Sequence, residues 1–178
     1  MAGILLLALQ FNIKIGAATI DVFSDIIGFA LIIIGILPLA ERNIMFKKSR
    51  NRAIIGILMA IIGQAINMTD WGDAASTMNT IAVGLSTIFT IYFTYYFTEA
   101  LILESKFQDK TATTRSFFIT WSIMALLIFI HYIAFMSNIS IAAIFVEAAA
   151  VICTIYFCST VLTACKQLYM DGLPTQHL

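Results

Sequence analysis

Residues 116–136 read SFFITWSIMALLIFIHYIAFM, a run of 21 residues that contains no Asp, Glu, Lys or Arg. A helix needs about 20 mostly apolar residues to cross a hydrocarbon core of about 30 Å. A buried helix of a soluble domain would not need so long a run without charge. This stretch therefore predicts a transmembrane helix.

The composition of the whole chain supports the same interpretation. Hydrophobic residues make up 61% of the 178 residues and charged residues only 11%. Soluble domains are about half apolar and about a quarter charged, and a soluble fold this apolar would expose large aggregating patches. The length suits one domain. We expect residues 1–178 to form a single integral membrane domain.

Four further stretches are long and apolar enough to meet or approach the length of a span. We therefore expect an all-α, polytopic membrane protein with six transmembrane helices, counting the N-terminal segment. The predicted spans are roughly residues 3–20, 25–40, 53–68, 75–103, 116–136 and 139–165.

The N-terminal segment allows two interpretations. Residues 3–13 are too few to cross a bilayer unless the helix continues through Lys14 to about Ile20, which gives a length of about 27 Å. The alternative is a re-entrant half-span that enters and turns back, with the alternating Phe11, Ile13 and Ile15 in extended structure. A full crossing is the interpretation we favour.

The connections between spans carry a clear charge pattern. Basic residues gather in every second connection, whereas residues 69–74 contain two acids and no base. The positive-inside rule places basic connections in the cytoplasm, which predicts that both termini are inside and that the chain resides in a cell membrane. The basic residues of the first cytoplasmic connection form either a lipid-headgroup surface or a candidate partner-docking surface: Arg42, Lys47, Lys48, Arg50 and Arg52.

Two titratable residues of the last two predicted spans, Glu147 and His131, attract attention by their depth. Glu147 is about 12 Å from the outer end of the sixth span, where a carboxylate costs several kcal/mol unless it faces a bundle interior or a cavity. It serves either as part of a functional site or as a structural lock paired with Lys14 or His131. His131 lies near the outer end of the fifth span, where a lone histidine is either a core hydrogen-bonder or a proton carrier.

Polar residues capable of binding a ligand concentrate in the outer half of the predicted bundle. A cavity with a few polar groups is the usual form of a small-molecule site. We therefore predict an outward-facing cavity centred on Glu147, His131 and Gln64. Its candidate ligand-binding residues are Glu147, His131, Gln64, Asn67, Asn12, Lys14, Asp25 and Asn79.

Stripes of small and hydroxyl residues occur on the fourth and sixth spans. Thr80, Thr87 and Thr94 recur at intervals of seven residues. Thr154 and Cys158 share a helix face with Glu147. Transmembrane helices use such residues to pack closely and to hydrogen-bond across interfaces. We interpret these stripes as scaffold.

Several classes of function find no support in the sequence. The formal net charge is zero, so no basic surface predicts nucleic-acid binding. Metal-ligand motifs and a phosphate-binding glycine loop are missing, so we expect no metal and no cofactor. The three cysteines fall in one apolar segment and do not have the CxxC spacing of a paired site. No nucleophile and base are expected at the same depth in the membrane, where they could form a hydrogen bond. We do not expect an enzyme.

The stretch 7–42 reads LALQFNIKIGAATIDVFSDIIGFALIIIGILPLAER and resembles a family of small uncharacterised bacterial multi-pass membrane proteins. The shared element opens a helix and consists here of Asp21, Val22 and residues 25–29, with Ser24 where the family usually has proline. The resemblance implies a bacterial cytoplasmic-membrane protein and brings no known activity.

A looser similarity links the chain to the substrate-binding membrane subunits of energy-coupling-factor vitamin transporters. Those subunits resemble it in length, span number and orientation. The similarity implies a small-molecule ligand bound from outside and further subunits as partners. The chain departs from them in the first helix, where Ala2 and Ala8 do not have the spacing of their alanine contact motif.

Two functions therefore compete. One is the binding or transport of a small solute through the predicted cavity. The other is a non-catalytic accessory role in a membrane complex, as a sensor, immunity protein or docking subunit.

Overall fold

The computed structural model describes residues 3–4, 12–15, 18–21, 25–69, 74–109, 114–137 and 140–169. Over these residues the chain forms five α-helices, one short 3₁₀ turn and one two-stranded hairpin. The elements are β1 (Asn12–Ile15), β2 (Ala18–Asp21), α2 (Asp25–Ile36), η1 (Leu37–Leu39), α3 (Ile44–Met68), α4 (Ala75–Phe107), α5 (Thr114–Met136) and α6 (Ser140–Tyr169).

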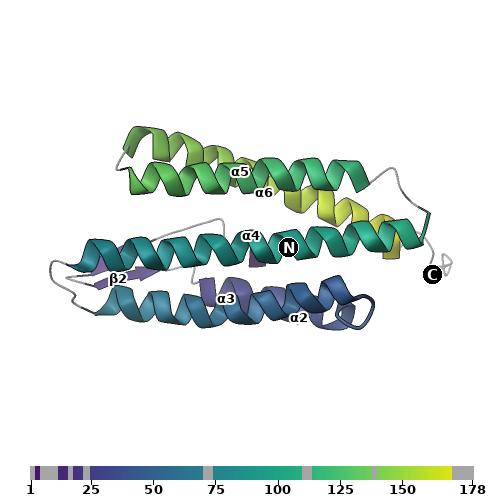
Figure 1. Cartoon of the computed structure of the whole chain (residues 1–178), viewed down its shortest axis with the longest axis horizontal. Helices are drawn as coiled ribbons and strands as arrows, with labels where there is room; N and C mark the ends of the chain where they lie inside the picture. Colours follow the sequence, from purple (N-terminus) through teal and green to yellow (C-terminus); the bar gives the residue numbers. More distant parts are fainter. Residues whose placement is uncertain are drawn as a thin grey trace, which may run out of the picture.

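The helices pack with their neighbours in the sequence, as short connections favour. The pairs α2–α3, α3–α4, α4–α5 and α5–α6 are in contact, and β2 lies against α3. In Figure 1, α4 runs between the pair α5 and α6 on one side and the pair α2 and α3 on the other. The long helices run roughly parallel to one axis, so each has one end at each end of the bundle.

The prediction of one continuous helix over residues 3–20 is wrong. Asn12–Ile15 and Ala18–Asp21 are antiparallel strands, with Ile13 paired to Ile20 and Ile15 to Ala18. Of the alternative, the extended structure of Ile13 and Ile15 is confirmed, Phe11 lies outside the described residues, and the re-entrant path stays a prediction. Alternating β-branched residues favour a strand.

Small residues allow α2 to approach its neighbours closely. The ring of Phe29 on α2 lies where a side chain on Gly56 of α3 would stand. Gly3 likewise lies directly against the backbone of Gly28 and the side chain of Ile32. Glycine at such positions lets transmembrane helices pack at short range.

Three of the helices are long and apolar enough to cross a membrane, judged by length and composition. They cover Thr80–Phe107, Ser116–Ala134 and Ile144–Tyr169 and match the last three predicted spans. The apolar helix over Asp25–Leu39 is shorter than a span. In α3 the first turns carry Lys47, Lys48 and Arg50, which leaves an apolar part of about 16 residues and about 24 Å.

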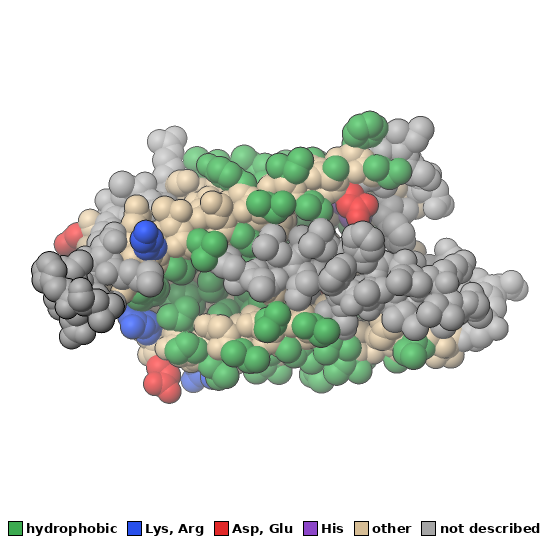
Figure 2. Space-filling view, turned by 180° about the vertical axis from the view of Figure 1, so that it is seen from behind, with side chains coloured by type: hydrophobic (Ala, Val, Ile, Leu, Met, Phe, Trp, Pro, Cys, Tyr) green, Lys and Arg blue, Asp and Glu red, His purple; other side chains and the backbone are tan. Residues whose placement is uncertain are grey.

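Basic side chains gather at one end of the bundle, which we call the basic end. It contains the start of α3 and the last turns of α4 and α6, where Lys106 and Lys166 lie. Figure 2 shows Lys and Arg at this end and, away from them, an acidic group beside a histidine. The described Lys and Arg side chains therefore gather at one end of the bundle, whereas the acidic connection with Asp70 and Asp73 lies outside the described residues.

Candidate functional site

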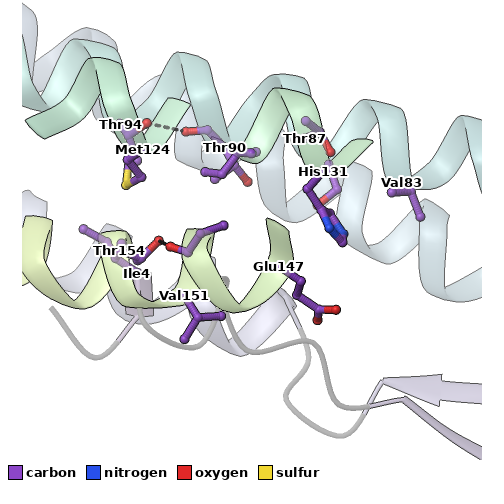
Figure 3. A pocket seen from close by; sticks show the side chains of 13 residues that line it. Ile4, Val83, Thr87, Thr90, Thr94, Met124, His131, Glu147, Val151 and Thr154 are labelled. Atoms are coloured by element: carbon purple, nitrogen blue, oxygen red, sulfur yellow. Dashed lines mark hydrogen bonds between the residues drawn. The ribbon is translucent and has the colours of Figure 1, made fainter. Parts of the chain in front are cut away.

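A cavity of about 80 Å³ lies among α4, α5 and α6, with Ile4 on its wall. Figure 3 shows side chains of α4 and α5 facing those of α6 across the gap. Its lining combines apolar residues with hydroxyl, carboxylate and imidazole groups: Ile4, Val83, Ser86, Thr87, Thr90, Thr94, Met124, Ile128, His131, Glu147, Ala150, Val151 and Thr154.

One face of α4 supplies the hydroxyl-rich wall. Ser86, Thr87, Thr90 and Thr94 follow the spacing of three and four residues that keeps side chains on one side of a helix. The Thr94 hydroxyl donates to the carbonyl of Thr90 at 2.8 Å and accepts from Trp121 Nε1 at 3.2 Å. Thr94 is buried, and it closes the cavity towards the basic end.

The wall formed by α5 carries the imidazole. Met124, Ile128 and His131 share one face of this helix and all three line the cavity. The Nδ1 atom of His131 is buried and has no hydrogen-bond partner among the residues that the structure describes. Buried polar atoms in proteins almost always have a partner, so His131 retains the capacity to bind a further group.

The carboxylate comes from α6. Glu147, Ala150, Val151 and Thr154 repeat the spacing of one helix face, and the Thr154 hydroxyl donates to the carbonyl of Ala150 at 2.8 Å. Glu147 is half-buried and forms no hydrogen bond or ion pair within the described part of the chain. In Figure 3, Glu147, His131 and Val83 lie at the same end of the gap.

A second acid lies behind the α4 wall. Ser86 donates a hydrogen bond from its hydroxyl to Oδ2 of Asp25, at the start of α2, with an oxygen–oxygen distance of 2.9 Å. This bond ties α2 to the cavity lining and brings a carboxylate close to it. The cavity therefore has acidic groups on two sides, Glu147 in the lining and Asp25 through Ser86.

The structure brings together part of the set predicted from the sequence. His131 and Glu147 both line the cavity, and Asp25 is one hydrogen bond away from it. Gln64 lies on α3, which contributes no residue to the lining. The remaining candidates have side chains outside the described part of the structure: Asn67 on α3, Asn79 on α4, and Asn12 and Lys14 on β1. The proposed pairing of Glu147 with Lys14 stays a prediction, because the Lys14 side chain also lies outside the described part of the structure.

Sequence reasoning missed the hydroxyl residues of the lining. Thr87, Thr94 and Thr154 were interpreted as packing stripes, and Ser86 was not singled out. A signal existed in the sequence, because each of the three helices has polar residues at helical spacing on one face. That these faces converge on one gap depends on how each helix is rotated about its axis.

The basic residues 42–52 divide into two groups in the structure. Arg42 forms an ion pair with Glu104 at 3.5 Å and lies 4.7 Å from the centre of the Tyr169 ring. Lys48 and Arg52 lie over tyrosine rings of α4, each 5.8 Å from the Tyr96 ring. The other two, Lys47 and Arg50, line a separate recess at the start of α3.

Among the described residues, no group of three or more His, Cys, Asp and Glu side chains has the arrangement of a metal site. Comparison with protein-family models, with curated proteins and with solved structures gives no match to this chain.

Proposed function

We propose that this chain is a multi-pass protein of a bacterial cytoplasmic membrane that binds a small monovalent cation or protonated amine in the cavity between α4, α5 and α6. The observation that carries the proposal is the presence of Glu147 and His131 in one lining, each without a partner in the described residues. Ionisable residues inside a membrane are expensive and mark ligand or ion pathways.

The charge of the surroundings favours a cation. The acidic groups at the cavity are Glu147 and, through Ser86, Asp25. The described lysine and arginine side chains lie at the basic end. Only one carboxylate, that of Glu147, belongs to the described lining, and the other oxygens there are neutral hydroxyl groups. Such a set supports a monovalent ligand better than a divalent metal, which takes six to eight oxygens or near-ideal octahedral geometry.

The volume limits the size of the ligand. A cavity of about 150 Å³ is known to accept benzene, and this one measures about 80 Å³. A small ammonium compound or a dehydrated monovalent cation fits that space, whereas a vitamin-sized solute does not fit without movement of α6. Small-solute binding is thus supported in a narrower form than the transporter similarity implies.

The orientation in the membrane is part of the proposal. If the basic end faces the cytoplasm, Glu147 and His131 lie towards the outer surface. A ligand would then enter from outside. Labelling of Lys47→Cys and Ser137→Cys variants in intact cells with a membrane-impermeant thiol reagent tests this directly, because Ser137 is exposed at the opposite end of the bundle and the reagent should reach only the second variant. The unsubstituted protein controls for the native thiols.

Thermal unfolding tests the binding itself. The purified protein should unfold at a higher temperature with one member of a panel of alkali-metal, ammonium and small alkylammonium salts at constant ionic strength. Glu147→Gln should abolish the increase, because it removes the carboxylate and keeps its size. Glu99→Gln is the matched control, an acid on α4 outside the lining.

No increase with any salt of the panel would overturn the proposal, as would an equal increase in both variants. A stoichiometric protein partner in gentle detergent extracts, with Glu147 and His131 replaceable without loss, would instead favour the accessory role.

A further inference from the structure

The recess at the start of α3 has the chemistry of a phospholipid site. It has a volume of about 550 Å³ and is lined by Ala40, Glu41, Asn43, Ile44, Lys47 and Arg50. Sites for small molecules and headgroups are typically recesses of about 300–1,000 Å³ with a few placed polar groups. This recess is separate from the cavity around Glu147, and none of its residues is shared with that lining.

Lys47 and Arg50 are the basic residues of this region that have no internal acidic or aromatic partner. Arg42, Lys48 and Arg52 are held by Glu104 or by tyrosine rings. In the described part of the chain, Lys47 has no ion pair. Arg50 makes only a bond of 3.5 Å from Nη2 to Asn51, and its buried Nε has no partner. Both side chains are therefore available to an anion.

The wall beside them is rigid. The Asn43 side-chain oxygen caps α3 by accepting from the backbone N–H groups of Met45 and Phe46, both at 3.0 Å. Its Nδ2 donates to the carbonyl of Ala100 at 3.3 Å and to Glu104 at 3.4 Å. These bonds fix the first turn of α3 against α4, so the position of Lys47 and Arg50 is set by the fold.

The charge of the recess suits a phosphodiester. Lys47 and Arg50 are positive and Glu41 is negative, which leaves one positive charge in the lining. A phosphodiester carries one negative charge, and a guanidinium group binds phosphate oxygens through paired N–H donors. Lysine binds the same oxygens as a point charge.

An apolar stripe leads away from the recess along α3. Ile54, Leu58 and Ile61 continue the spacing of Lys47 and Arg50 and are 44%, 54% and 47% exposed. From Arg50 to Ile61 the helix rises about 16 Å, which is about half of a hydrocarbon core of about 30 Å. The stripe therefore has the length that the acyl chains of one leaflet would cover.

From this arrangement we propose that the recess binds the headgroup phosphate of one anionic phospholipid, whose acyl chains lie along Ile54, Leu58 and Ile61. The ligand class is a phosphodiester with a net negative charge, of which phosphatidylglycerol is the simplest. The proposal rests on membrane residence and is independent of cation binding near Glu147.

Native mass spectrometry of the detergent-purified protein with added lipid tests the proposal. We expect one phosphatidylglycerol retained per chain, and phosphatidylcholine retained much more weakly. The double variant Lys47→Gln, Arg50→Gln should bind phosphatidylglycerol about 25-fold more weakly, since each basic residue contributes about a factor of five to the affinity.

The matched control is Lys48→Gln, Arg52→Gln, which removes the same charge from side chains that lie over tyrosine rings. It should keep the retained lipid. Equal loss in both double variants would overturn the proposal in favour of diffuse surface charge. Equal retention of phosphatidylglycerol, phosphatidylethanolamine and phosphatidylcholine would overturn it as well.

Two further measurements distinguish binding of a lipid headgroup from binding of a free phosphate ion. Leu58→Gln should weaken phosphatidylglycerol binding, whereas competition by inorganic phosphate at millimolar concentration would show a site for the free anion and contradict the proposal. If Lys47→Gln, Arg50→Gln unfolds at the same temperature as the unaltered protein without added lipid or cation, the variant is folded, and failure of one proposal does not affect the other.

Discussion

The two halves of the helical bundle differ in how their side chains pack. In the half nearer the basic end, which we call the packed half, the largest fully buried side chains of α3 to α6 all occur: Phe46, Ser49, Phe93, Thr94, Thr98, Leu101, Ser105, Phe117, Met124, Phe157 and Val161. The open half comprises the rest of these helices. It contains Glu147 and His131 at one end of the cavity, and the other end of the cavity is lined by Thr94 and Met124 of the packed half.

The difference follows from what each half offers its neighbours. In the packed half, aromatic rings interlock, with Phe46 edge-on to Phe97 at 5.9 Å between ring centres. Small hydroxyl residues fill the remaining space, and Ser49 donates to the carbonyl of Phe93 at 3.3 Å. In the open half, Glu147 and His131 have no such complement. The packed half therefore joins the helices that carry Glu147 and His131, and the buried Nδ1 atom of His131 has no partner among the described residues.

The largest expected effect comes from removing an aromatic ring of the packed half. Phe46 is fully buried, so Phe46→Ala leaves a cavity that the rigid neighbours cannot fill. We expect a loss of about 3 kcal/mol, at the lower end for such changes, because lipid solvates apolar groups in the unfolded state as well. Equilibrium unfolding in mixed micelles measures the change.

The matched substitution in the open half is Phe145→Ala, where the ring is 73% exposed. It should cost less than about 0.5 kcal/mol, the usual range for surface positions. Similar losses for the two variants would mean that the halves do not differ in packing.

The second prediction uses two glycines of the α2–α3 pair with contrasting surroundings. Gly56→Ala places a methyl group against the Phe29 ring and should destabilise the α2–α3 pair by about 1–3 kcal/mol. Gly35→Ala places it in open space and should be neutral or stabilising by up to about 1 kcal/mol. A joint loss for both variants would indicate a backbone effect rather than contact with Phe29.

The sequence predicted the helices of the bundle more fully than its N-terminal segment. Uninterrupted apolar runs such as 116–136 leave little choice but a long helix, and the last three predicted spans have the length and composition expected. The segment 12–21 is short and alternates β-branched with polar or small residues, and over so few residues a strand and a helix have similar sequence patterns. Pairing of Ile13 with Ile20 across the hairpin decides between them.

The candidate site could be predicted only in part. Glu147 and His131 stand out because ionisable groups inside apolar runs are costly. The participation of Thr87 and Thr154 in the lining could not be predicted. Apolar residues occur on every face of α5 and α6, so neither helix has an amphipathic pattern that would show which face points towards the cavity. Gln64 was included for the same reason, because its predicted depth in the membrane matches that of the cavity. Its helix, α3, contributes no residue to the lining.

The smallest expected effect concerns the ion pair that ties α4 to the segment before α3 at the basic end. Glu104 accepts from Asn43 and pairs with Arg42, whose guanidinium also lies over the Tyr169 ring of α6. The Arg42 side chain is 50% exposed, so solvent screens the pair and its coupling should be at most about 1 kcal/mol.

A double-mutant cycle of Arg42→Gln and Glu104→Gln isolates this coupling from other losses. The coupling should decrease when salt is raised from 0.05 to about 0.5 M, since the Debye length then falls well below 10 Å. A salt-independent coupling above about 2 kcal/mol would contradict the prediction. It would mean that charge pairing holds the basic end together, and the contrast between the halves would then rest on electrostatics rather than on the fit of the aromatic rings.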